Sequence, residues 1–287
     1  MISLQIRHTT TYRFHRPVTF SPHRLMLRPR ESRDLRVISN HVMLAPAASV
    51  TWAQDVFGNA VATAAFASAG DHLVIDSTTR LQLDALPWPV FAIAGSAVGF
   101  PFRYSDAEWT DLGALGTPQF PDAAGQLRTW AQRFVRGNPT DTLSLLKDLS
   151  AGVSQQISYQ SRDEEGTQSP VQTLDRGWGS CRDFAVLFVE AVRSLGFGAR
   201  IVSGYLYNPD GTRTGAAGGG STHAWAEVFV PGAGWIPFDP TNRSMGGFNL
   251  IPVAVVRDIR QANPVQGSFV GEGGAFRDMT VEVQVTA

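Results

Sequence analysis

Cys181 is the only cysteine in the 287-residue chain, and its surroundings favour a nucleophile. It lies in the segment GWGSCRD (177–183), directly before an apolar pattern with helical spacing. A cysteine in the first turn of a helix faces unpaired backbone N–H groups and the positive end of the helix dipole, which stabilise a thiolate. The alternative is a buried cysteine that packs like an alanine, which is common for this residue type. We favour the nucleophile, because a lone cysteine cannot form an internal disulfide and makes a poor metal site.

A thiol nucleophile needs a base, and His223 is the only histidine that follows Cys181 in the sequence. Residues 222–230 alternate as a half-buried strand does, and Asp239 ends the next apolar run, which predicts a neighbouring antiparallel strand. A carboxylate on that strand can reach the free ring nitrogen of His223 and fix its tautomer. Taken alone, His223 is typical of a strand histidine whose hydrogen bonds are satisfied locally, and Asp239 is typical of an aspartate that caps a turn before proline. In helix–strand–strand order with Cys181, the three predict a catalytic set.

Four linked motifs in this region resemble those of the transglutaminase-like superfamily, cysteine enzymes related to papain. The similarity covers roughly residues 120–250, and Tyr159 matches the aromatic residue found upstream of the nucleophile. The motifs are GWGSCRDFA (177–185), GFGARIVSGY (196–205), HAWAEV (223–228) and WIPFDPTN (235–242). The resemblance implies that Cys181, His223 and Asp239 form a catalytic triad.

The N-terminal region resembles the β domain that precedes this core in a bacterial subfamily of transglutaminase-like cysteine proteases. The matching segments are HTTTYRF (8–14), PHRLMLRPR (22–30) and DVFGN (55–59). The resemblance therefore spans most of the chain and implies an enzyme, but it does not define a substrate.

These motifs predict acyl transfer through a thioester on Cys181, most simply the hydrolysis of a peptide, amide or isopeptide bond. Transamidation, as in crosslinking transglutaminases, and a non-catalytic peptide-binding module are the alternatives. The backbone N–H of Cys181 is the expected first oxyanion donor. Candidates for a second are Tyr159, Gln172 and Trp178, while Trp178 and Trp225 are expected to wall the cleft.

Composition limits the partners that we expect. A formal net charge of −1 argues against nucleic-acid binding, and no apolar run is long enough for a membrane span. Five arginines between residues 24 and 36 are interpreted as a solvated strand face. The acidic run 163–165 is too short for a calcium loop. We expect no cofactor or metal, a cytoplasmic location and a peptide or protein substrate; the N-terminal domain is a candidate surface for a partner protein or a homo-oligomer.

The element pattern predicts an α+β protein with an all-β, sandwich-like domain in front. Residues 1–100 contain six strand candidates between turn signals, at 3–12, 23–29, 37–44, 50–56, 60–67 and 72–83. Residues 101–121 are predicted to be a linker, 122–255 the catalytic core with helices packed on an antiparallel sheet, and 256–287 an extension with a final strand. Apolar spacing predicts helices near 127–134, 143–153 and 181–195. The glycine-rich stretch 208–220 is predicted to be either a mobile flap or a plain hairpin connection.

Overall fold

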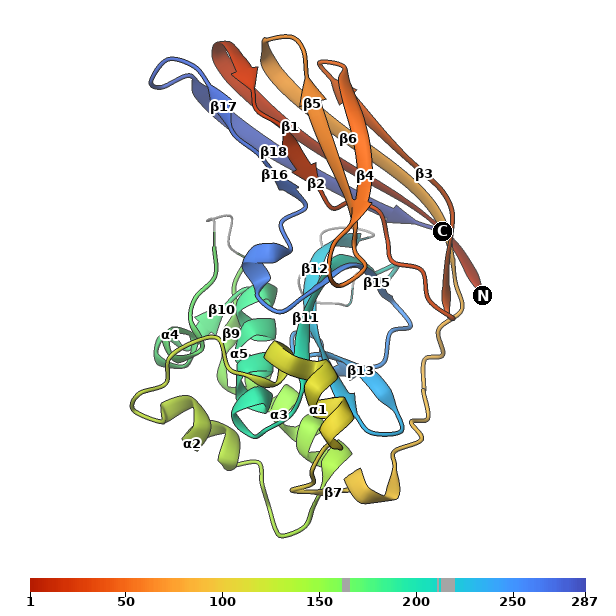
Figure 1. The fold of residues 1–287 in the computed structure, drawn as a ribbon, viewed down its shortest axis with the longest axis vertical. Helices are drawn as coiled ribbons and strands as arrows, with labels where there is room; N and C mark the ends of the chain where they lie inside the picture. Colours follow the sequence, from red (N-terminus) through yellow and green to blue (C-terminus); the bar gives the residue numbers. More distant parts are fainter. Residues whose placement is uncertain (162–165, 211, 213–219) are drawn as a thin grey trace.

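The computed structural model describes residues 1–161, 166–210, 212 and 220–287. The predicted fold class is confirmed: an all-β region precedes an α+β core. The acidic run 163–165 lies outside the described residues, as does most of the stretch 208–220. In Figure 1 the all-β region lies above the helices and the sheet of the α+β core.

The all-β region, called the β domain below, consists of two sheets that enclose an apolar cluster around Phe20, Leu25 and Ile75. The first sheet has the order β17-β1-β6-β3, with β18 also paired to β1, and the second has the order β16-β2-β5-β4. Their strands are β1 (Ile2–Phe20), β2 (His23–Leu25), β3 (Leu35–Ala45), β4 (Ala48–Gln54), β5 (Ala60–Phe66), β6 (Gly70–Leu83), β16 (Val265–Gln266), β17 (Phe269–Val270) and β18 (Phe276–Thr286). The chain therefore returns after the core to add strands to both sheets.

The α+β core is built on an antiparallel sheet with the order β14-β13-β12-β11-β15. Its strands are β11 (Ala199–Tyr207), β12 (Gly220–Val230), β13 (Gly234–Asp239), β14 (Ser244–Met245) and β15 (Leu250–Val256). The helices are α1 (Asp106–Leu112), α2 (Gln126–Gln132), α3 (Thr142–Gln156), α4 (Pro170–Arg176) and α5 (Cys181–Ser194). Two small pairs complete the core: β9 (Ser158–Tyr159) with β10 (Trp178–Gly179), and β7 (Gly99–Phe100) with β8 (Thr140–Asp141).

Helix α5 is the central helix of the core and packs on β12. Its Phe184, Leu187 and Phe188 are fully buried, and the Phe188 ring lies 5.5 Å from that of Phe238 on β13. This packing fixes the start of α5, where Cys181 lies, against the strands that carry His223 and Asp239.

The stretch predicted to be a linker contains the short helix α1. Ser105 and Glu108 form a capping box at its start, so the helix is locally specified. Only Leu112 of this helix is buried, which explains why apolar spacing does not reveal it.

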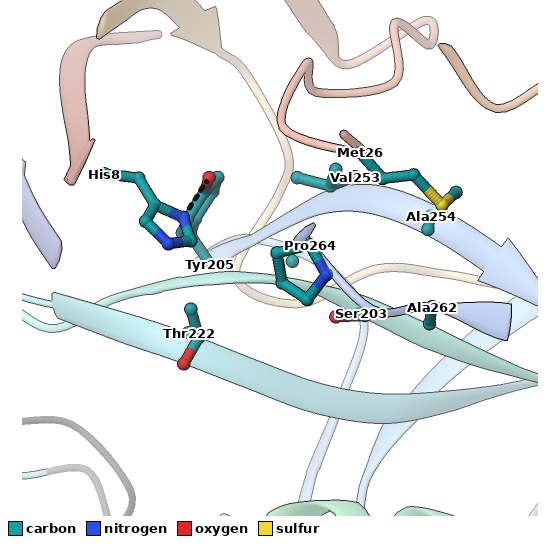
Figure 2. A pocket seen from close by; sticks show the side chains of 10 residues that line it. His8, Met26, Ser203, Tyr205, Thr222, Val253, Ala254, Ala262 and Pro264 are labelled. Carbon is teal, nitrogen blue, oxygen red and sulfur yellow. Dashed lines mark hydrogen bonds between the residues drawn. The ribbon is translucent and has the colours of Figure 1, made fainter. Parts of the chain in front are cut away.

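The β domain and the α+β core share one apolar cluster, which runs from Leu4 and Ile6 on β1 to α5 and β11. A buried polar contact lies beside it, where His8 Nδ1 and the Tyr205 hydroxyl are 2.9 Å apart. Figure 2 shows these two side chains pointing toward each other, joined by this hydrogen bond, among the residues that line a cavity of about 10 Å³. The two units are thus joined by packing and by a specific hydrogen bond.

Candidate active site

The loop before Cys181 is shaped by hydrogen bonds to one buried carboxylate. Asp183 accepts from the Ser180 backbone N–H at 2.8 Å, from the Ser180 hydroxyl at 2.9 Å and from the Gln168 backbone N–H at 2.7 Å. A Cβ on Gly179 would lie 2.9 Å from the Asp183 Cβ, so this close approach requires glycine. Cys181 is thereby held, partly exposed, as the first residue of α5, at the positive end of the helix dipole.

His223 is buried in the middle of the sheet and is anchored through one ring nitrogen. Its Nε2 lies 2.8 Å from an Asp239 carboxylate oxygen, and both side chains are at most 2% exposed. Within the described part of the chain, the other nitrogen, Nδ1, has no nitrogen or oxygen partner. Nδ1 is therefore the nitrogen that is free to interact with the Cys181 thiol.

Asp239 is held in turn by the turn that follows β13. Its Oδ1 accepts from the backbone N–H groups of Thr241 and Asn242 at 3.0 and 3.2 Å. Its Oδ2 accepts from the Asn242 side-chain amide at 2.8 Å in addition to facing His223. A carboxylate that accepts this many hydrogen bonds is stabilised in its charged form.

The electrostatics of the three groups favour a thiolate paired with an imidazolium. Burial alone would raise the pKa of Cys181, but the hydrogen bond and charge of His223, the Ala224 backbone N–H and the Arg182 charge lower it below its ordinary value. Burial alone would lower the pKa of His223, but Asp239 and Cys181 raise it well above its usual range. Burial opposes ionisation of Asp239 too, yet His223 and Asn242 lower its pKa.

Tyr159 is the oxyanion candidate that the electrostatics link to the triad. Burial and the negative charges of Cys181 and Asp239 raise its pKa to about 12, against the opposing charge of Arg182. Its phenol therefore stays protonated near neutral pH and can donate a hydrogen bond. It is half-buried on β9, which pairs in parallel with β10 just before Cys181.

The other predicted oxyanion and cleft residues differ in position. Gln172 is exposed on α4, and its side-chain oxygen accepts from the Ser169 backbone N–H, so it caps that helix and the structure does not bring it to the triad. Trp178 is half-buried beside Cys181, with the Arg176 guanidinium 5.7 Å from its ring. Trp225 is only 1% exposed, so it does not wall an open cleft; its ring stacks on His223 with 6.2 Å between centroids.

Two side chains that organise the site are absent from the sequence-based candidates. Asn242 follows Asp239 within the WIPFDPTN motif, and this Asp-Pro-Thr-Asn turn is a signal that could have identified it. Gln168 is buried and donates from its side-chain amide to the Trp178 carbonyl at 3.2 Å. No local sequence pattern marks Gln168, because its partners Trp178 and Asp183 come after α4 in the sequence.

Comparison with known proteins agrees with this arrangement. Residues 128–240 match the transglutaminase-like superfamily and residues 4–82 match the bacterial transglutaminase-like N-terminal region. The chain is a transglutaminase-like core with a bacterial transglutaminase-like N-terminal region. The resemblance inferred from the sequence is thus confirmed. The match to the core includes all three residues of the Cys–His–Asp set.

Relatives that align over nearly the whole of this transglutaminase-like chain occur in mycobacteria. It is 24% identical to an uncharacterized protein of Mycobacterium leprae, over 99% of both chains. It is 27% identical to an uncharacterized protein of Mycobacterium tuberculosis, over 97% of this chain and 91% of the relative. These matches show that the β domain and the core occur together in one polypeptide.

A crystal structure of a "Putative Cysteine Protease" from Cytophaga hutchinsonii has the same two-part fold. The two structures superpose with a TM-score of 0.74 over 99% of this chain and 91% of the other, at 17% identity. At this identity the match establishes the fold of the transglutaminase-like chain and leaves its reaction to be argued from the site.

Within the described ranges, no helix combines the length and the apolar character that a membrane crossing requires. The part of the chain that the structure describes also has no group of three His, Cys, Asp or Glu side chains placed to hold a metal ion.

Proposed function

We propose that this chain is a cysteine-dependent acyl-transfer enzyme that hydrolyses a peptide, amide or isopeptide bond in a peptide or protein substrate. One observation carries the proposal: His223 binds Asp239 through Nε2 at 2.8 Å, while its Nδ1 has no other partner among the described residues and Cys181 lies at the start of α5. This is the geometry that a thiolate nucleophile with an oriented base requires.

The reaction follows from these positions. The Cys181 thiolate attacks the carbonyl carbon, a C–S bond forms, and the carbonyl electron pair moves onto oxygen. The Cys181 backbone N–H and the Tyr159 phenol are the proposed donors to that oxyanion. Collapse breaks the C–N bond while His223 gives its proton to the departing amine, which leaves a thioester.

Hydrolysis of the thioester restores the enzyme. His223, now neutral, takes a proton from water as the water oxygen attacks the thioester carbonyl. The second tetrahedral intermediate collapses, the C–S bond breaks, and the carboxylic acid leaves with the thiolate–imidazolium pair restored. Asp239 orients the ring through both steps and neither gains nor loses a proton.

Alkylation of Cys181 by iodoacetamide tests the nucleophile. We expect the full chain to be labelled at neutral pH faster than a free thiol, and His223→Ala to lower the rate at least about tenfold. His41→Ala is a matched control, because this histidine is exposed on β3. A wild-type rate no faster than that of a free thiol would reject the proposal and favour a non-catalytic peptide-binding module.

A second experiment identifies the acyl acceptor. An activated ester forms the acyl-enzyme, and a fluorescent primary amine is then added to compete with water. Release of the free acid faster than amine incorporation supports hydrolysis. Incorporation in excess of hydrolysis would replace it with transamidation, the alternative reaction of this fold family.

A further inference from the structure

The turn between β4 and β5, residues 55–59, is a preformed unit of the β domain. Asp55 accepts from the backbone N–H groups of Phe57 and Asn59, each at 2.9 Å, and from the Asn59 side-chain amide at 2.8 Å. Gly58 has a φ of +72°, a backbone conformation that glycine adopts without strain. Figure 1 shows this turn extending from the β domain toward β12 and β15.

The turn docks on the last strand of the core sheet. Asn59 is fully buried and makes two hydrogen bonds to Val255 of β15, donating to its carbonyl at 2.8 Å and accepting from its N–H at 2.9 Å. Arg30 fastens the same turn, since its guanidinium donates to the Phe57 carbonyl at 2.9 Å and to the Asn59 side-chain oxygen at 2.6 Å. Arg30 is thus a docking residue rather than part of a solvated strand face.

This docking places Phe57 against a small apolar cluster that contains Trp225. Besides Trp225, the cluster consists of Val202, Leu206, Leu250 and Val255, all at most 3% exposed. The Trp225 ring lies over Gly204, where an added Cβ would come within 2.9 Å of the indole. Gly204 is also the residue directly opposite His223 in the β11–β12 register.

The cluster reaches the proposed base through ring stacking. The Trp225 and His223 rings are 6.2 Å apart between centroids, with an angle of 25° between their planes. Asp239 holds the ring at Nε2, and at Nδ1 the described chain offers only the Cys181 thiol and no nitrogen or oxygen partner, so polar contacts leave the imidazole able to tilt about the Asp239 contact. The orientation of Nδ1 toward Cys181 therefore depends on the ring that packs beside it.

We propose that Phe57 of the β domain is a positioning residue for His223: it closes the cluster and so holds the Trp225 indole against the imidazole. The inference rests on the proposed function, since it assigns the β domain a part in activating Cys181. Removal of the Phe57 ring leaves space into which the indole can move. The imidazole then spends less time facing the thiol, and the thiolate is less favoured.

The test is the pH dependence of Cys181 alkylation by iodoacetamide in the full-length protein. Phe57→Ala should lower the rate at mildly acidic pH by about three- to tenfold, which corresponds to about 0.7–1.4 kcal/mol, and move the acid limb to higher pH. Phe57→Leu should restore most of the rate, because it refills the cluster. Tyr159, Arg182 and Asp239, the other charged or titratable groups that act on Cys181 and His223, are unchanged in these variants.

Phe66→Ala is the matched control. Phe66 is also a half-buried phenylalanine of the β domain, but it packs on Phe20 and His23, away from the core sheet. We expect it to lower thermal stability and leave the alkylation profile unchanged. Phe57→Val, a milder truncation expected to give an intermediate shift, serves if Phe57→Ala fails to fold.

Two results would overturn the inference: profiles of Phe57→Ala and wild type that superimpose, or an equal shift in Phe66→Ala. Either can occur with rapid wild-type labelling, in which case the proposed function stands. Slow labelling of the wild type would instead reject the proposed function itself.

Discussion

The buried contact between His8 and Tyr205 should make the junction between the β domain and the core sensitive to acid. Burial lowers the pKa of His8 from 6.5 to about 4, although the charge of Asp76 opposes this. Its Nδ1 lies 2.9 Å from the Tyr205 hydroxyl and its Nε2 lies 3.3 Å from the Thr10 hydroxyl. The folded protein therefore holds a neutral imidazole that the unfolded chain can protonate freely.

The sign and size of the effect follow from the two pKa values. Between pH 6.5 and about 4 the unfolded chain binds more protons, so the free energy of unfolding decreases as the pH falls through this window. At about pH 4.5 the loss amounts to about 2.5 kcal/mol relative to about pH 7.5. This is a large fraction of the net stability of a typical protein.

His8→Gln isolates this contribution, because glutamine stays neutral and can still bond to the Tyr205 hydroxyl. Urea unfolding at the two pH values should show that the variant loses about 2.5 kcal/mol less than wild type on acidification. Other acid-sensitive groups are common to both proteins and cancel in the comparison. The exposed His41 on β3 gives a control, His41→Gln, that does not touch the junction. Equal losses in wild type and His8→Gln would refute the reasoning.

Three further predictions concern the site. Asn242→Ala removes the amide that donates to Asp239 at 2.8 Å, and we expect kcat/KM to fall about tenfold, with Asn242→Asp falling further because two carboxylates then repel. Because the pKa of Cys181 is lowered and that of His223 raised, alkylation should stay fast below neutral pH, and turnover should fall as the pH rises through the His223 pKa. An alkylation rate that follows the titration of an ordinary cysteine thiol would contradict this prediction. Tyr159→Phe should lower kcat about 10- to 100-fold with little change in the alkylation rate, and an unchanged kcat would remove Tyr159 as an oxyanion donor.

The sequence is informative about the triad because each member lies in a local pattern. Cys181 precedes a strongly apolar helix, His223 lies in an alternating strand, and Asp239 ends the next one. The strands of His223 and Asp239 are joined by a short turn and pair antiparallel, which places the two residues side by side. The order of the motifs that contain them, Cys then His then Asp, resembles that of the transglutaminase-like superfamily.

Other features depend on contacts that no local pattern contains. Strand alternation places Trp225 on the same face as His223, but it does not reveal what covers that face. The cover is Phe57, held by an Asn59–Val255 hydrogen bond between residues 196 positions apart. Gln172 is a candidate oxyanion donor from the sequence, yet its Ser169-Pro170-Val171-Gln172 context is that of a capping box.

The β domain contacts both faces of one short segment of the core sheet. Gly204 and Tyr205 are consecutive in β11, so they face opposite sides of the sheet. On one side His8 bonds to Tyr205; on the other, the cluster closed by Phe57 holds Trp225 over Gly204 and beside His223. Protonation of His8 would strain the same segment that positions the imidazole. Loss of Cys181 reactivity in acid should therefore begin at a lower pH in His8→Gln than in wild type, and identical acid limits would show that the two contacts act independently.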